Sequence, residues 1–245
     1  MNIDEVVKKV TDEVYKQLGS CADAAQGGCN LELAGYIEHS ILNPDMTRAK
    51  ILEQCALARQ YKFANVCVTP YFVREAAEAL KTCNVGVCAP VGFPHGAAST
   101  AAKLSEIKEC AANGATELDV ELNLVAIKSG EFDEVKRELL AMMGAAGFGV
   151  KVKAIYEQGL LSEEEKKITL AIIRDAGPAY VKISNALTGK AACKDDVAFV
   201  RGIVGDAVKI KIDGGIKTAA FAREILGSGA DRIGCSASVA IVTGG

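Results

Sequence analysis

Two lysines occupy positions where a buried strand normally carries only apolar side chains. Lys182 lies in the run 179–184 and Lys211 in the run 208–213, both rich in β-branched residues. An ammonium group is costly to bury without a partner. The pattern therefore indicates a functional pair, in which one lysine is an amine nucleophile and the other is a neighbouring cation that keeps it unprotonated.

This chemistry also requires a proton carrier. A lysine attacks a carbonyl only as the free amine, yet its ordinary pKa of about 10.4 leaves it protonated at neutral pH. Burial and a nearby ammonium lower that pKa, and a carboxylate then moves protons through carbinolamine, imine and enamine. Asp119 is the candidate carboxylate. The alternative is an inert buried network of Lys182, Lys211 and Asp119, although apolar packing is commonly as stable as such a network.

The elements that must position these residues alternate regularly between strand and helix after residue 31. The expected strands are 36–42, 64–69, 85–91, 116–122, 150–156, 179–184, 207–213 and 230–235. The expected helices are 47–60, 71–81, 99–113, 131–146, 162–176, 194–204 and 218–227. Eight such repeats predict an α/β fold of the (β/α)8 TIM-barrel type with a missing or vestigial last helix, and a doubly wound sheet is the alternative.

A (β/α)8 barrel carries its catalytic groups at the carboxyl ends of the strands. The unusual polar residues fall in or just after the expected strands: Glu38, His39, Cys67, Asp119, Glu121, Asn123, Lys153, Lys182, Lys211 and Asp213. Strand alternation places Asp119, Glu121 and Asn123 on one face. We therefore expect the fourth to seventh strands to direct carboxylates and amines into one lumen.

Glycine-rich turns follow the last three strands. Gly189 and Lys190 follow the sixth strand, and three residues, Gly214, Gly215 and Lys217, follow the seventh. Gly234 and Ser236 come at the end of the eighth. Backbone amides, a lysine and a serine hydroxyl at this end of a barrel suit a phosphate monoester. The alternative is a set of ordinary tight turns.

Composition excludes several classes of function. The 245-residue chain has a net charge of −3, so nothing points to nucleic acid, and no apolar run is long enough for a membrane span or a secretory signal. Its nine cysteines lack metal-ligand spacing and predict reduced thiols in the cytosol. The only two histidines, His39 and His95, argue against a histidine metal site or a hydrolytic triad.

The first 28 residues differ from the rest of the chain. Residues 3–18 have apolar side chains at helical spacing, and the small-residue stretch 19–28 predicts a flexible linker. We therefore divide the chain into an N-terminal helix with linker, residues 1–28, and a barrel domain, residues 29–245. The helix either packs on the barrel or docks elsewhere. Helix plus linker resembles the encapsulation peptides that load enzymes into bacterial microcompartments, which implies a shell-protein partner for residues 1–18.

Several sequence blocks together resemble the deoxyribose-phosphate aldolase family over 36–238. They are EHSIL at 38–42, FANVCVTP at 63–70, VGFPHG at 91–96, ELDVELN at 117–123, VKIS at 181–184, KIDGG at 211–215 and RIGCS at 232–236. The resemblance implies a class I aldolase, a lyase that cleaves 2-deoxy-D-ribose 5-phosphate reversibly to acetaldehyde and D-glyceraldehyde 3-phosphate through a lysine Schiff base. It implies no metal and no organic cofactor, a cytoplasmic homodimer and a small sugar phosphate or aldehyde as substrate.

The resemblance also implies roles for individual residues. Lys182 matches the Schiff-base lysine, Lys211 its pKa-lowering partner and Asp119 the proton relay. Glu38 stands where the family has a relay aspartate, and Cys67 occupies a family pocket position, where packing is its expected role.

The chain departs from the family pattern at other positions. Asp213 replaces a small residue, Glu121 replaces an apolar one, and residues 185–188 lengthen the loop after Lys182. These departures leave two alternatives open: a Schiff-base aldolase for a different sugar or carbonyl compound, and a non-catalytic barrel that serves assembly or ligand binding.

Overall fold

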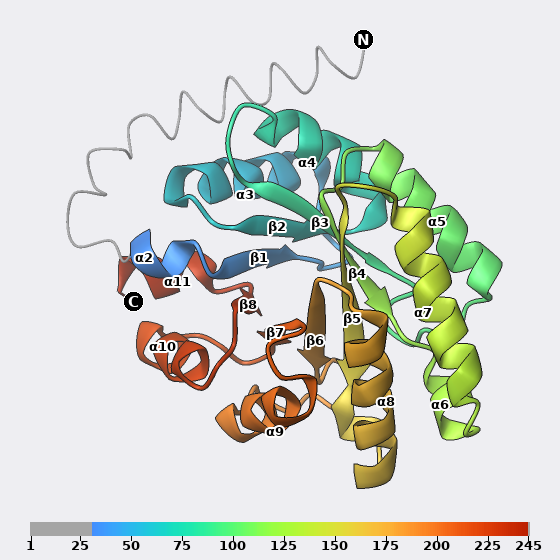
Figure 1. Ribbon diagram of the computed structural model, residues 1–245. Coiled ribbons are helices and arrows are strands. Elements are labelled where there is room, and N and C mark those ends of the chain that lie inside the picture. Colours follow the sequence, from blue (N-terminus) through green and yellow to red (C-terminus); the bar gives the residue numbers. More distant parts are fainter. Residues whose placement is uncertain (1–30, 245) are drawn as a thin grey trace.

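The computed structural model describes residues 31–244, and the predicted N-terminal helix and linker over 1–28 lie outside this range. Eight parallel strands close into a barrel in sequence order, with β8 paired to β1 (Figure 1). The strands are β1 (Ile37–Ile41), β2 (Asn65–Val68), β3 (Gly86–Val91), β4 (Glu117–Glu121), β5 (Lys151–Glu157), β6 (Tyr180–Ser184), β7 (Lys209–Asp213) and β8 (Arg232–Cys235). The closed barrel confirms the (β/α)8 prediction over the doubly wound alternative.

Helices surround the barrel. They are α2 (Leu31–Ala34), α3 (Arg48–Tyr61), α4 (Val73–Leu80), α5 (Thr100–Ala112), α6 (Leu124–Lys128), α7 (Phe132–Ala146), α8 (Glu163–Ala176), α9 (Lys194–Val204), α10 (Ala219–Gly227) and α11 (Ser238–Thr243), with 3-10 helices at Pro70–Phe72 and Gln158–Leu160. The short helices α2 and α6 and the 3-10 helix Gln158–Leu160 were not expected from the sequence, whereas the 3-10 helix Pro70–Phe72 overlaps the start of the expected helix 71–81. The expected vestigial last helix is α11, which has six residues.

Local hydrogen bonds set several helix boundaries. The hydroxyl of Thr47 accepts from the backbone N–H of Lys50 at the start of α3. Ser162 and Glu165 form a reciprocal capping box at the start of α8, and Gly177 ends that helix with φ 71°. These groups satisfy backbone donors and acceptors that a helix end leaves free. They explain why the helices begin and end close to the expected positions.

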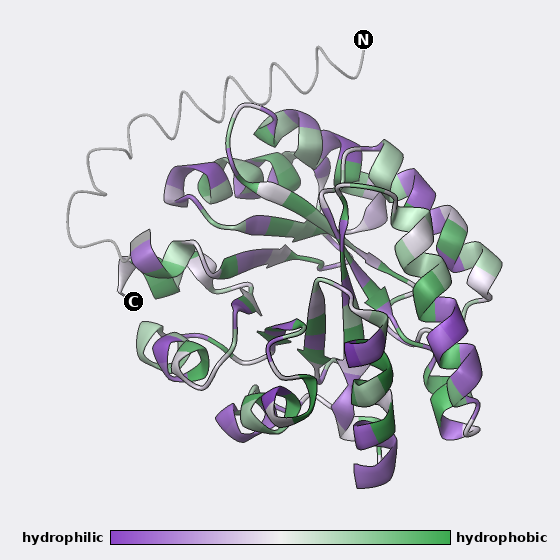
Figure 2. Ribbon diagram, in the orientation of Figure 1, coloured by the Kyte–Doolittle hydropathy of each residue, from purple (hydrophilic) through white to green (hydrophobic). Residues whose placement is uncertain are grey.

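The two faces of the barrel strands differ in chemistry. Outward residues such as Val66, Val181 and Ile233 are fully buried against the helices. Figure 2 shows apolar residues concentrated on strands and on inward helix faces, with polar residues toward the outside. The lumen is different, because charged side chains fill it where branched aliphatic residues are usual. In the described part of the chain, no helix is long and apolar enough to cross a membrane.

Candidate active site

Asp119 is the centre of the charged lumen. Its Oδ2 atom accepts from Nζ of Lys182 at 2.8 Å and from Nζ of Lys211 at 2.7 Å. Its Oδ1 atom lies 2.8 Å from Nζ of Lys153 and 3.1 Å from Sγ of Cys88. Burial raises the pKa of this carboxyl, but the surrounding ammonium groups outweigh burial and hold the pKa well below its usual range. Asp119 is therefore an ionised carboxylate shared by three lysines.

Lys182 lies at the end of the lumen that opens toward the strand carboxyl termini. Its Nζ atom contacts a second carboxylate, Oδ2 of Asp213, at 2.8 Å. The ring of Phe93, from the loop after β3, lies 5.8 Å from the same Nζ atom. Lys182 is 3% exposed, whereas the side chain of Asp213 is 23% exposed. The amine is therefore enclosed, and Asp213 is the more exposed member of the pair.

The structure corrects one expectation about Lys182. Burial lowers its pKa, but Asp119 and Asp213 outweigh burial and raise the pKa well above the ordinary value. Lys211 is indeed the register partner of Lys182 on the neighbouring strand. Both lysines share the same two carboxylates, so the neighbouring cation alone does not keep Lys182 unprotonated. In this arrangement Lys182 is an ammonium ion that must lose a proton before it can attack.

Glu38 and Lys153 complete the charged layer beneath Lys182. Oε2 of Glu38 accepts from Nζ of Lys153 at 2.9 Å, and Oε1 is paired with Lys211. Burial raises the pKa of Glu38, but Lys153 and Lys211 outweigh burial and lower it to about 2. Asn65 donates to Glu38 at 3.1 Å. The longer Glu side chain thus bridges two lysines.

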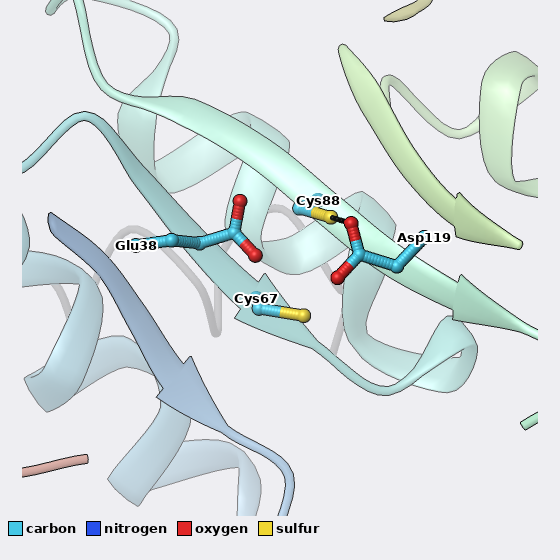
Figure 3. A group of neighbouring side chains, drawn as sticks. All are labelled: Glu38, Cys67, Cys88 and Asp119. Carbon is cyan, nitrogen blue, oxygen red and sulfur yellow. Dashed lines mark hydrogen bonds between the residues drawn. The ribbon is translucent and has the colours of Figure 1, made fainter. Parts of the chain in front are cut away.

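Four side chains of the lumen lie close enough together to be candidate ligands of a cation. The ligand atoms of Glu38, Cys67, Cys88 and Asp119 lie within 4.8 Å of one another, and Figure 3 shows them converging from four strands. Nζ of Lys153 contacts three of the four residues, at 2.8 to 3.1 Å. The ammonium group of Lys153 therefore supplies the positive charge that balances these carboxylates, at the place where a metal ion would otherwise lie.

The glycine-rich turns form a pocket next to Lys182, with a volume of about 280 Å³. The pocket is lined by five of the seven residues predicted to bind phosphate: Gly214, Gly215, Lys217, Gly234 and Ser236. The other two, Gly189 and Lys190, are not in its lining. They belong to a loop that packs on the β7 turn, where the N–H of Ala192 donates to the carbonyl of Gly214 at 2.9 Å.

Asp213 also lines this pocket. Its carboxylate lies against Gly234, where a Cβ atom would approach Oδ1 to 2.0 Å. Glycine is therefore required at this position for Asp213 to lie where it does. The same carboxylate consequently borders both the pocket and the amine of Lys182.

The remaining predicted residues have structural contacts. Asn123, expected in the pocket, caps α6 by accepting from the N–H of Ala126 at 3.1 Å. His39 faces outward from the barrel, where its ring nitrogens contact Ser238 at 3.0 Å and Gln54 at 2.8 Å. Cys67 is 1% exposed and lies beside Cys88 in the strand register.

Sequence reasoning missed three members of the lumen. Glu117 contacts Lys153 at 2.8 Å, Arg232 lies 3.7 Å from Glu117, and Cys88 contacts both Asp119 and Lys153. Glu117 shares strand parity with Asp119, which was an available signal. Arg232 and Cys88 carried no signal of their own, because a polar residue at a strand start or a single cysteine is common.

Comparisons with known proteins find relatives over most of the chain. A scan of family models finds no match. A deoxyribose-phosphate aldolase from Brevibacillus brevis is 42% identical over 209 residues, covering 85% of this chain and 94% of the relative. Another from Staphylococcus carnosus is 39% identical, covering 87% of this chain and 97% of the relative.

Solved structures give the same assignment. The aldolase QR15 matches with a TM-score of 0.82 and 31% identity, covering 86% of this chain and 95% of the other. The deoxyribose phosphate aldolase from Aeropyrum pernix, described as a tetramer, matches with a TM-score of 0.79 and 27% identity, covering 96% of each chain. Together with the identity to the curated relatives, these matches show that the chain belongs to the deoxyribose-phosphate aldolase family.

Proposed function

We propose that the protein is a class I aldolase that cleaves 2-deoxy-D-ribose 5-phosphate to acetaldehyde and D-glyceraldehyde 3-phosphate. The observation that carries the proposal is the enclosed amine of Lys182, held by Asp119 and Asp213 beside the glycine-lined pocket. A nucleophile, two proton acceptors and a site for an anionic group are thereby adjacent. Family membership supports the same reaction.

The reaction begins with proton transfer from Lys182. Asp213 contacts two ammonium groups and Asp119 contacts three, so Asp213 is the less strongly paired acceptor. The free amine then adds to the substrate aldehyde carbon to form a carbinolamine, and loss of water gives the imine. Asp119 relays protons in these steps, while Lys211 and Glu38 hold it in place.

Carbon–carbon cleavage follows from the imine. Loss of the proton from the C3 hydroxyl sends the O–H electron pair into a new carbonyl at C3. The C2–C3 bond breaks, and the cationic imine accepts the electron pair of that bond and becomes an enamine. Glyceraldehyde 3-phosphate leaves. Protonation of the enamine at C2 and addition of water then release acetaldehyde and regenerate Lys182.

The pocket beside Lys182 is the proposed phosphate site. Backbone amides of Gly214, Gly215 and Gly234, with Lys217 and Ser236, suit the phosphate oxygens. The adjoining loop brings Gly189 and Lys190 near the same turn. Asp213 opposes a dianion in this pocket, and this observation favours a second candidate: an aldolase of the same chemistry whose substrate carries less charge.

One comparison tests both candidates. Initial rates of cleavage are measured with 2-deoxyribose 5-phosphate and with 2-deoxyribose, by coupled detection of glyceraldehyde 3-phosphate or glyceraldehyde. A kcat/KM clearly higher for the phosphorylated sugar supports the first candidate, and one higher for the free sugar supports the second. Turnover of neither would reject the first candidate and 2-deoxyribose as the substrate of the second, and would favour the non-catalytic barrel.

We further propose that residues 1–18 dock on a microcompartment shell protein and that the barrel is a homodimer in the cytoplasm or within such a compartment. The support is the amphipathic pattern, the small-residue linker and the family resemblance. A variant lacking residues 1–28 is expected to remain folded and active but to lose co-assembly with shell proteins. Loss of folding would reject the docking proposal, and sedimentation of the full chain tests the dimer.

A further inference from the structure

A group of buried polar atoms at the barrel mouth has no hydrogen-bond partner. Of eleven such side-chain atoms in the described residues, five belong to Glu121, Glu157 and Asn185. Glu121 ends β4, Glu157 ends β5, and Asn185 directly follows β6. Unpaired buried polar groups are rare in folded proteins, and each needs an explanation such as a catalytic role or a bound ion or water. Here they gather at the ends of three successive strands.

Glu121 lies on the wall of the chamber that holds Lys182. The strand register aligns Glu121 with Ile155, and Ile155 with Lys182. Glu121 shares the inward parity of Asp119, and its exposure is 0%. The loop after β3 packs closely against Glu121: a Cβ atom added to Gly96 of this loop would lie only 3.1 Å from Cγ of Glu121. This same loop carries Phe93 to Lys182.

The ion pairs of the lumen leave Glu121 without a charged partner. Four cations, Lys153, Lys182, Lys211 and Arg232, are paired with four carboxylates, Glu38, Glu117, Asp119 and Asp213. Burial raises the pKa of Glu121 to about 9, although Lys182 acts in the opposite direction. A neutral carboxylic acid both donates and accepts hydrogen bonds. Glu121 is therefore suited to a hydroxyl group.

Glu157 and Asn185 lie at the ends of the next two strands, where Glu157 is the register partner of Ser184. Oε1 of Glu157 accepts from the backbone N–H of Leu187 at 3.2 Å, which fixes the loop after β6. Its other oxygen is unpaired, as are both amide atoms of Asn185, which is 4% exposed. The loop after β6 thus begins with a buried amide group whose donor and acceptor are both unpaired.

This polar group and the glycine-lined pocket lie on opposite sides of Lys182. Lys182 is on β6, the pocket follows β7 and β8, and Glu121 and Glu157 end β4 and β5. A substrate joined to Lys182 through its carbonyl carbon can extend to both sides. When the part of the substrate that derives from the acceptor aldehyde lies toward the pocket, the carbons that derive from the aldol donor face Glu121.

We propose that Glu121 and Asn185 form a subsite for a hydroxyl group on the donor carbon next to the imine, so that the enzyme also uses α-hydroxy carbonyl donors such as glycolaldehyde. This inference rests on the proposed Schiff base at Lys182. In the synthetic direction the amine and glycolaldehyde form an imine and water, and loss of a C2 proton gives the enamine. The enamine C2 attacks the acceptor aldehyde, whose oxygen takes up a proton, and hydrolysis releases an aldose phosphate that keeps its C2 hydroxyl.

The test compares glycolaldehyde with acetaldehyde as donors to D-glyceraldehyde 3-phosphate. The kcat/KM ratio of the two donors is measured in the wild type and in Glu121→Val, Glu121→Gln, Asn185→Ala and the surface control Glu164→Gln. We expect the ratio to fall about tenfold or more in Glu121→Val and also to fall in Asn185→Ala, because an apolar wall does not bind a hydroxyl. Glu121→Gln keeps a hydrogen-bonding group and is expected to retain most of the ratio, and Glu164→Gln to retain all of it.

An unchanged ratio in Glu121→Val, or no turnover of glycolaldehyde by a wild type active with acetaldehyde, would overturn the inference. If Glu121→Val does not fold, Asn185→Ala decides by the same criterion. Borohydride trapping of acetaldehyde separates this result from the proposed function. An adduct on Lys182 with an unchanged donor ratio rejects the subsite alone, whereas absence of any adduct rejects the Schiff base and the subsite with it.

Discussion

Nζ of Lys182 and Oδ2 of Asp213 lie 2.8 Å apart on the neighbouring strands β6 and β7. Lys182, the proposed nucleophile, is therefore paired with one of the residues at which the sequence is expected to depart from the family pattern. Asp213 also borders the glycine-lined pocket. One side chain thus influences both the protonation of the amine and the charge that the substrate meets.

Replacing Asp213 by serine is expected to shift the pH dependence of kcat/KM. Because Asp213 raises the pKa of Lys182, its removal increases the fraction of free amine at a given pH. The limb of the profile that rises with pH should move about one pH unit or more toward acid. The surface variant Asp206→Ser is the control, and an unmoved profile in Asp213→Ser would show that Asp213 does not act on the amine.

Replacing Lys153 by methionine is expected to lower the free energy of unfolding by about 3–5 kcal/mol, because it leaves buried carboxylates without a counter-ion. Lys153 lies within 2.9 Å of Glu38, Glu117 and Asp119 and is fully buried. Lys151→Met, on the same strand, removes an exposed lysine 3.3 Å from Glu117 and should cost less than about 1 kcal/mol. Urea denaturation measures both, and equal losses would contradict the assigned role.

Replacing Lys217 by methionine is expected to affect phosphorylated substrate selectively. Lys217 lines the glycine-rich pocket, and a charge-assisted hydrogen bond to phosphate corresponds to roughly a ten- to hundredfold change in binding. The KM for 2-deoxyribose 5-phosphate should therefore rise while the KM for 2-deoxyribose stays constant. Lys81→Met, at the residue that follows α4, is the control. A parallel rise for both sugars would place the phosphate elsewhere.

Glu121 predicts a particular dependence of stability on pH. Its pKa in the folded protein is about 9, above the ordinary 4.5, so the folded state keeps a proton that the unfolded chain releases. This contribution to stability is complete below about pH 4.5 and declines until about pH 9. Glu121→Gln cannot titrate, so its free energy of unfolding relative to that of the wild type should increase steadily as the pH rises over this range. Melting temperatures at pH 5 and pH 8 test this, and a constant difference would contradict the buried acid.

The fold was predictable because each repeat carries its own local signals. Alternating apolar runs located the eight strands, and caps such as Thr47 and Ser162 located helix starts, so the expected boundaries agree with the structure to within two residues. Short helices such as α2 and α6 were not predicted because they have too few residues for a periodic pattern. They depend on the barrel for their stability.

The site was predictable only in part. Strand parity was enough to expect Lys182, Lys211 and Asp119 in one lumen. The protonation state of Lys182 was not predictable. It depends on whether carboxylates or cations lie closer to its amine, and that balance is set by distances between side chains that come from four strands. Cys88 and Arg232 likewise become part of the site only through barrel closure, which no local pattern in the sequence describes.

The most direct test of the proposed reaction is reductive trapping with acetaldehyde. Borohydride reduces the imine to a stable secondary amine, and peptide mass spectrometry locates the added ethyl group. The proposed mechanism predicts the modification on Lys182 and its loss, together with aldol turnover, in Lys182→Met. An ethyl group on Lys211 or Lys153 in its place, or full turnover with Lys182 unmodified, would contradict the assignment of Lys182 as the nucleophile.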